Sequence, residues 1–184
     1  KYQMPLRVLS SFNKSGGTLI TKEDNSLESA VISGITCSND DSKIILRNVP
    51  DTPGIAAKIL SPISEAGIDV DVIVQNVGSD KSTDFTFTVK NDLSEKAAKI
   101  LKDLTEGFGG GEVELVKDVS KVSVVGVGMK SHAGVAAQMF GALANKKINI
   151  DMISTSEIKI SVVVAKDKAE EAVIALHDEF ELDK

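Results

Sequence analysis

Residues 122–164 read VSVVGVGMKSHAGVAAQMFGALANKKINIDMISTSEIKISVVV, and the pattern in this stretch decides the fold. A β-branched run stops at a loop that contains glycine, and an amphipathic stretch follows the loop. Two further apolar runs come next, separated by Ser154-Thr155-Ser156. This succession predicts a strand, a loop, a helix and two more strands joined by a turn.

A weaker copy of this stretch lies upstream. Residues 54–60 (GIAAKIL) align with residues 134–140 (GVAAQMF), and residues 68–71 (IDVD) align with residues 148–151 (INID), both at the same shift in residue number. Similarity at a fixed spacing is the signature of a structural unit that occurs twice. A chain of 184 residues has room for two domains of roughly 75 to 90 residues each.

Each copy contains two predicted helices with one apolar face. In the first copy, Asp51 or Thr52 can cap a helix, and Pro53 suits its first position because proline lacks the amide that would go unpaired there. Asp167 and Glu170 have the spacing of a capping box before the last helix. The residues expected to face the core are Ile55, Ile59, Leu60 and Ile63 in a helix ended by Gly67; Ala97, Ile100, Leu101 and Leu104 in residues 94–104; Val135, Met139, Phe140 and Leu143; and Ala169, Ala172, Val173, Leu176 and Phe180 in residues 168–180.

Two strands are predicted before the first helix, at residues 31–38 and 43–49, and Asn39-Asp40-Asp41 between them indicates a hairpin. Cys37 lies in the first of these strands, where a lone thiol is expected to be buried and inert. The other predicted strands are residues 68–77, 84–89 and 112–117 of the first copy, and residues 148–153 and 158–164 of the second.

This order of elements predicts an α+β fold of two ferredoxin-like βαββαβ domains, with antiparallel sheets and the helices on one face of each. The second copy lacks a fourth strand of its own, and residues 6–11 (LRVLSS) form a strand-like run without a partner. We expect this run to complete the second sheet, so that removing residues 1–20 unfolds the C-terminal half. The predicted domains are residues 30–119, inserted, and residues 1–20 plus 120–184, with residues 21–29 as a linker.

The bulk composition argues against several classes of partner. A net charge of −6 provides no basic face for nucleic acid or for an anionic membrane. Apolar residues at 42% and charged residues at 26% are typical of a soluble globular protein, and no apolar run approaches the ~18 residues that span a bilayer. The N-terminal sequence KYQMPLRVLSSF lacks the features of a secretory signal, so the cytoplasm is the expected location.

No catalytic or metal site is predicted. Gly126-Val127-Gly128 after a strand, with Asp151 further on, suggests a dinucleotide-binding loop, but Ser131 stands where the third glycine belongs. Each unit is also too short for a doubly wound sheet. His132 and His177 have no metal-ligand spacing between them or with the cysteine, and we expect both to be structural or solvated.

Both copies instead repeat one binding geometry. A loop leads to a helix start that carries a glycine, Gly54 or Gly134, and the free amides at a helix N-terminus attract a carboxylate. A carboxylate site beside acids or amides fits a zwitterion, that is, a free α-amino acid. The alternative interpretation is that the glycines only permit tight loops and that the polar residues face solvent. The polar residues of the next strand are Asp69 and Asp71 in the first copy, and Asn149 and Asp151 in the second.

The same stretches resemble the regulatory C-terminal part of aspartate kinase, which also occurs as a separate β subunit. The resemblance covers nearly the whole chain, and the catalytic domain of that family has no counterpart in it. No cofactor is therefore expected in this chain, since ATP and Mg would bind at the catalytic domain. The segments that carry the resemblance are GVGMKSHAGVAA, INIDMISTSEIKISV and ALHDEFEL in residues 126–182, and PLRVLSSF, GTLI, VPDTPGIAAKI, VDVIVQNV and TDFTFTV in residues 5–89.

The resemblance implies two ACT domains, a homodimer formed through them, and feedback inhibition by threonine, lysine or both, bound between ACT domains. It also implies a catalytic domain or α subunit of aspartate kinase as partner. The effector-binding residues that it implies are Asp51, Gly54, Ile55, Ala56, Asp71, Gln75 and Asn76 in the first domain, and Met129, Ser131, His132, Ala136, Gln138, Asn149, Ile150 and Ser156 in the second.

Two other functions stay open at the level of sequence. The chain could be a structural dimerisation module without a ligand, and its association would then be unaffected by amino acids. It could also be an enzyme with a nucleotide site at residues 126–128, and it would then bind nucleotides.

Overall fold

The computed structural model describes residues 6–9, 11, 16–20, 31–78, 82–108 and 111–182. These residues form a six-stranded antiparallel sheet in the order β4-β5-β3-β6-β8-β7, a separate sheet of β1 and β2, and four α-helices. The elements are β1 (Leu6–Val8), β2 (Thr18–Ile20), β3 (Gly34–Pro50), α1 (Ile55–Glu65), β4 (Ile73–Val77), β5 (Ser82–Lys90), α2 (Ser94–Gly107), β6 (Glu112–Val125), α3 (Val135–Asn145), β7 (Met152–Thr155), β8 (Lys159–Ala165) and α4 (Ala169–Glu179), with short 3-10 turns η2 (Asn91–Leu93), η3 (Val127–Ser131) and η4 (Lys166–Lys168).

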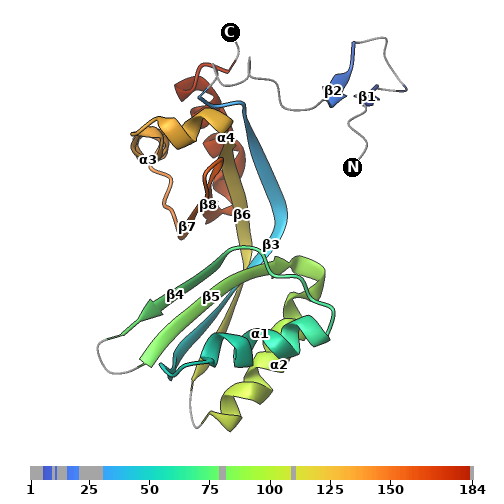
Figure 1. The fold of residues 1–184 in the computed structure, drawn as a ribbon, viewed down its shortest axis with the longest axis vertical. Coiled ribbons are helices and arrows are strands. Elements are labelled where there is room, and N and C mark those ends of the chain that lie inside the picture. Colours follow the sequence, from blue (N-terminus) through green and yellow to red (C-terminus); the bar gives the residue numbers. More distant parts are fainter. Residues whose placement is uncertain are drawn as a thin grey trace.

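The two long strands β3 and β6 run antiparallel to each other and pass through both halves of the molecule (Figure 1). In the first unit, residues 41–118, the second half of β3 pairs with β5 and with the first half of β6. In the second unit, residues 31–38 and 119–182, the second half of β6 pairs with β8 and with the start of β3. Each unit therefore has four strands and two helices, as the repeat predicts.

The prediction that residues 6–11 complete the second sheet is wrong. Leu6–Val8 pairs with Thr18–Ile20 in the separate two-stranded sheet, because a partner close in sequence is reached at little entropic cost. The place of the missing strand is taken by residues 34–38, whose register with β6 runs from Gly34 opposite Val125 to Ser38 opposite Lys121. The linker predicted at residues 21–29 lies outside the described residues.

The hairpin predicted at Asn39-Asp40-Asp41 is also wrong, because β3 continues through this segment as one strand. The register between β3 and β6 shifts between Ser38 and Asp41 and again between Asp41 and Lys43. The polar residues are thus accommodated as a bulge, which bends a strand without reversing it. Cys37, predicted to be buried, is exposed on the outer part of this strand.

Each unit has its own hydrophobic core between its helices and one face of its strands. The predicted apolar stripes are confirmed, although Leu60, Ile100, Leu104, Phe140, Val173 and Phe180 are only partly buried. The first core holds Ile44, Leu46, Phe85 and Phe87 of the sheet, with Ile55, Ile59, Ile63, Ala97 and Leu101 of the helices. The second holds Val122, Val124, Val162 and Val164, with Val135, Met139, Leu143, Ala172 and Leu176.

The helix starts differ from those predicted. α1 begins after Gly54, not at Asp51 or Thr52, and α4 begins after Lys168 without a side-chain cap, so the capping box at Asp167 is not formed. Among the described residues, none of the helices is long and apolar enough to cross a membrane.

Asp41 is a buried carboxylate close to the bulge of β3. It is 3% exposed, and its Oδ1 accepts a hydrogen bond of 3.0 Å from Nζ of Lys90. Its Oδ2 has no hydrogen-bond partner within the described part of the chain. The hydrogen bond from Lys90 to Asp41 raises the pKa of the lysine.

Replacing Lys90 with methionine is expected to lower the free energy of unfolding by about 1–2 kcal/mol, because Asp41 then stays buried with neither oxygen paired while water screens part of the loss. Urea unfolding measures the difference. Since the pKa of Lys90 is raised in the folded state, the difference is full below the ordinary lysine pKa and disappears as the pH rises through the raised pKa. Lys168→Met, which removes an exposed pair with Glu171, is the control and should leave the urea midpoint unchanged. An equal loss in both variants would contradict the role of Asp41.

Candidate functional site

Two hollows lie at equivalent places in the two units. The first lies at the N-terminus of α1, which follows β3, and the second at the N-terminus of α3, which follows β6. The first hollow has a volume of about 400 Å³ and the second of about 470 Å³. Residues 51–56 and Gln75 line the first. The second is lined by Met129, His132, Gly134, Val135, Ala136, Thr155, Ser156, Glu157 and Ile160.

The helix start at each hollow is open to a ligand. The N-cap residues Gly54 and Gly134 have φ of 91° and 102°, a left-handed conformation that glycine adopts without steric cost. Neither helix has a side-chain cap or an acidic residue in its first turn. A Cβ atom added to either glycine would have no other atom within 4 Å. The positive end of each helix dipole therefore faces free space, where it can attract a carboxylate, although in α1 the N–H of Ile55 donates to the carbonyl of Thr52 at 3.1 Å.

Polar groups from a neighbouring strand border each helix start. Gln75 of β4 reaches the first hollow, and Thr155 at the end of β7, its equivalent in the repeat, reaches the second. Next to Thr155, Ser156 starts a tight turn in which its backbone N–H donates to the carbonyl of Lys159 at 2.7 Å. His132 is held by a hydrogen bond of 2.8 Å between its Nδ1 and the carbonyl of Gly128. Each hollow thus combines the positive end of a helix with hydrogen-bonding side chains and one carboxylate, Asp51 in the first and Glu157 in the second.

Nine of the predicted site residues line these two hollows, and six do not. The first hollow brings together Asp51, Gly54, Ile55, Ala56 and Gln75, and the second Met129, His132, Ala136 and Ser156. Asp71 is paired with Lys121, and Asn149 donates a hydrogen bond of 3.4 Å to Asp151. Ser131 ends η3, Gln138 lines a third hollow beside Phe180, and Asn76 and Ile150 line a fourth.

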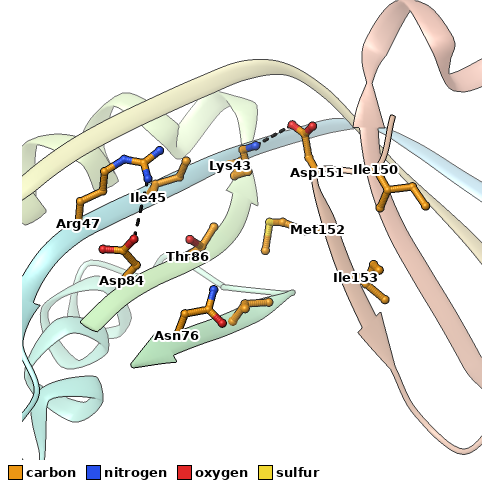
Figure 2. Close-up of a pocket in the computed structure, with 11 residues that line it drawn as sticks. Lys43, Ile45, Arg47, Asn76, Asp84, Thr86, Ile150, Asp151, Met152 and Ile153 are labelled. Carbon is orange, nitrogen blue, oxygen red and sulfur yellow. Dashed lines mark hydrogen bonds and ion pairs between the residues drawn. The ribbon is translucent and has the colours of Figure 1, made fainter. Parts of the chain in front are cut away.

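The fourth hollow, of about 340 Å³, lies between the two units, and we call it the inter-unit hollow. Its walls are the face of the first sheet that the helices leave open and residues 150–153 of the second unit (Figure 2). Lys43, Ile45 and Arg47 follow one another along β3, and Lys43 points to Asp151 across the hollow. Its cations and carboxylates are already paired with one another, so the inter-unit hollow is a polar junction of the units.

Sequence reasoning missed Thr155 and Glu157 in the second hollow, and both lysines that join the units. The repeat carries a signal for Thr155, since this residue aligns with Gln75 at the shift that relates the two copies. Lys43 lies on β3 and Lys121 on β6. Their separation in residue number is slightly smaller than the shift between the two copies, so an alignment at that shift does not pair them.

The glycine loop at residues 126–128 has a packing role. A Cβ atom on Gly126 would overlap the carbonyl oxygen of Val31 and lie 2.7 Å from Cα of Ile32. The glycine therefore permits the close approach of two backbone segments, which explains it without a nucleotide. Within the described residues, no group of three or more His, Cys, Asp or Glu side chains is placed to hold a metal ion.

Comparison with known proteins assigns both units to one class. Models of the ACT domain match residues 44–106 and residues 122–180, which fall within the first and the second unit. The chain thus contains two ACT domains.

Similar proteins place these ACT domains in a family, because one relative matches almost over its whole length. The regulatory subunit of aspartate kinase from Thermus thermophilus is 41% identical, with a TM-score of 0.77 over 82% of this chain and 99% of that chain. The chain belongs to the aspartate kinase family and corresponds to its regulatory region. A crystal structure of aspartokinase alpha and beta subunits matches with 42% identity and a TM-score of 0.77, over 82% of this chain and 99% of that chain.

Full-length aspartate kinases are also similar to this chain. Aspartate kinase of Pseudomonas fluorescens (strain SBW25) is 56% identical over 184 residues, which are all of this chain and 45% of that protein. The chain therefore spans about half the length of the curated relatives it matches.

Proposed function

We propose that this chain binds a feedback amino acid, threonine or lysine or both, and thereby controls the phosphorylation of aspartate by a catalytic domain or α subunit of aspartate kinase. That reaction serves the biosynthesis of lysine, threonine and methionine. The observation that carries the proposal is the pair of equivalent hollows, each with an uncapped helix start behind a left-handed glycine.

The chemistry of the hollows fits a free amino acid. The helix start attracts the α-carboxylate, and Asp51 at the rim of the first hollow offers a carboxylate for the α-ammonium group. Gln75 offers an amide that can accept or donate a hydrogen bond, as the hydroxyl of threonine or the ammonium group of lysine requires. A volume of about 400 Å³ is ample for either side chain.

A homodimer through the ACT domains is part of the proposal. β4 and β7 are the two edges of the six-stranded sheet, and edge strands carry unpaired backbone groups that can pair with another chain. Ile73 and Val77 on β4 and Ile153 on β7 are 44%, 64% and 45% exposed. Pairing of these edges between two copies would cover the apolar side chains and extend the sheet. Asn149 and Ile150, which lie outside both hollows in one copy, could then face the hollow of the partner.

Replacing Gly54 with aspartate is expected to weaken effector binding roughly 10–100-fold, because a carboxylate would enter the space that the effector carboxylate needs. Titration calorimetry with threonine and lysine, separately and together, measures the affinity. Gly67→Asp is the matched control, since Gly67 also has a positive φ of 73° with open space around it but lies at the other end of α1. Equal binding by Gly54→Asp and the control would show that the first hollow is not the site.

A second substitution tests the second hollow. Ser156→Phe should fill it and reduce binding there, while the first hollow is unchanged.

If neither amino acid binds to the folded wild-type dimer, the chain is instead a dimerisation module without a ligand, as its exposed edge strands alone would allow.

A further inference from the structure

Two ion pairs cross between the ACT domains in a reciprocal arrangement. Lys43, on β3 of the first unit, donates from Nζ to Oδ2 of Asp151 in the second unit at 2.7 Å (Figure 2). Lys121, on β6 of the second unit, pairs with Asp71 of the first. Asp71 and Asp151 align with each other in the repeat, and Lys43 and Lys121 are close to aligned. The two pairs therefore occupy equivalent places in the units. Each unit contributes one lysine and one aspartate.

The lysines are the less exposed members of these pairs. The side chains of Lys43 and Lys121 are 11% and 16% exposed, whereas those of Asp151 and Asp71 are 30% and 48% exposed. An ammonium group that leaves water needs a charged or polar partner. Each of these largely covered lysines therefore holds the position of one aspartate of the other unit.

The aspartates are in turn fixed to their own sheets. The backbone N–H of Asp71 donates to the carbonyl of Thr88 on β5 at 3.0 Å, and that of Asp151 donates to Val163 on β8 at 2.8 Å. The apolar residues Val72, Val119, Met152 and Val163 form a cluster of their own, with Val72 and Met152 directly after the two aspartates. The ion pairs thus flank an apolar contact between the parts of the six-stranded sheet that belong to the two units.

The same strands lead to the two hollows. Asp71 lies shortly before Gln75, which lines the first hollow, and Asp151 lies shortly before Thr155, which lines the second. The strand of Lys43 continues to Pro50, next to the rim of the first hollow. Each ion pair therefore links a strand that ends at one hollow with a strand of the other unit.

We propose that Lys43, Asp151, Lys121 and Asp71 are positioning residues that fix the angle between the ACT domains and couple the two hollows. An amino acid bound in one hollow then changes the affinity of the other, because a shift of one strand moves an ion pair shared with the second unit. The coupling rests on the proposed function, since it needs an amino acid in a hollow. The fixed angle between the domains does not depend on an amino acid.

The test compares two double variants that lose the same charge. Lys43→Met with Lys121→Met removes both crossing pairs and keeps the apolar stems, and the partly exposed aspartates that remain are solvated by water. The control, Lys117→Met with Lys168→Met, removes two exposed pairs, with Glu95 and Glu171, that lie within one unit each.

The angle is measured as the distance between spin labels at Ser64 of α1 and Ala144 of α3, both exposed and one repeat apart, with Cys37 replaced by serine. Labelled protein is diluted with unlabelled protein to isolate distances within one chain. The wild type and the control are expected to give one narrow distribution, and the variant without the crossing pairs at least about a twofold broader one. An unchanged distribution in that variant overturns the proposal, whether or not amino acids bind.

The coupling is measured by hydrogen exchange with and without threonine or lysine. In the wild type, protection is expected to rise by about fivefold or more at the first turns of both α1 and α3. In the variant Lys43→Met with Lys121→Met, protection should rise only in the unit that binds the amino acid. Lys43→Asp combined with Asp151→Lys, which exchanges the charges of one crossing pair and keeps the other pair, should retain the rise in both units. Protection that still spreads to both units in the double methionine variant refutes the coupling, and no change in the wild type refutes the proposed function instead.

Discussion

A chain that starts at Asp40 is expected to lose the fold of the second ACT domain while the first stays folded. The truncation removes residues 34–38, which pair with β6 from Lys121 to Val125. It also removes Ile32 from the second core, where this side chain is 8% exposed. Hydrogen exchange should show the amides of β8 and α4 unprotected, while those of β5 and α2 keep their protection.

The control is a chain that starts at Ala30, which lacks β1 and β2 but keeps the whole of β3. Because Leu6–Val8 pairs with Thr18–Ile20 and not with the six-stranded sheet, both ACT domains of this chain should remain folded. Loss of the second domain in the control would mean that the N-terminal strands support it after all.

Replacing Gly126 with alanine is expected to destabilise the second domain by about 3 kcal/mol, at the upper end of the cost of overpacking. The φ of Gly126 is −176°, which any residue can adopt, so the cost comes from contact alone. The added methyl group would meet the backbone of Val31 and Ile32, which cannot rotate away as a side chain could. It would also strain the hydrogen bond of 2.7 Å from Ser33 N–H to the carbonyl of Val125. For a domain of this size, the melting temperature of the second domain should fall by roughly 12–24 °C.

Gly141 provides the matched control for this substitution. It lies in α3 of the same domain, and a Cβ atom there would meet nothing within 4 Å. Gly141→Ala should raise the stability by about 0.5–1 kcal/mol, because alanine has the higher helix propensity. A loss in Gly126→Ala no larger than about 0.5 kcal/mol would mean that the segment at Val31 moves aside easily.

The internal repeat predicted the fold because its pattern is local. The apolar stripes of α1 and α3 follow from spacing along one helix, and both glycines at the helix starts follow from the same alignment. The family resemblance then supplied nine residues that the structure gathers in two hollows. Their role in binding an effector stays a prediction.

The errors concern contacts between distant segments. A polar run such as Asn39-Asp40-Asp41 can turn a strand back or bulge within it, and the choice depends on the partner strand β6, which is distant in sequence. Likewise, nothing near Lys43 or Lys121 in the sequence indicates that an aspartate of the other unit lies opposite. The side chain of Cys37 is exposed because residues 34–38 form an edge with only one neighbouring strand.

The exchange of strands between the units sets an order for folding during synthesis. All of residues 41–118 leave the ribosome before β8 and α4 are synthesised, so the first domain can fold early. Gly34, in contrast, can pair only after Val125 has been synthesised. Until then, residues 34–38 remain an unpaired edge, and such an edge can be captured by another chain. At high local concentration, two nascent copies could therefore swap this strand and form an entangled dimer in which each second domain is complete.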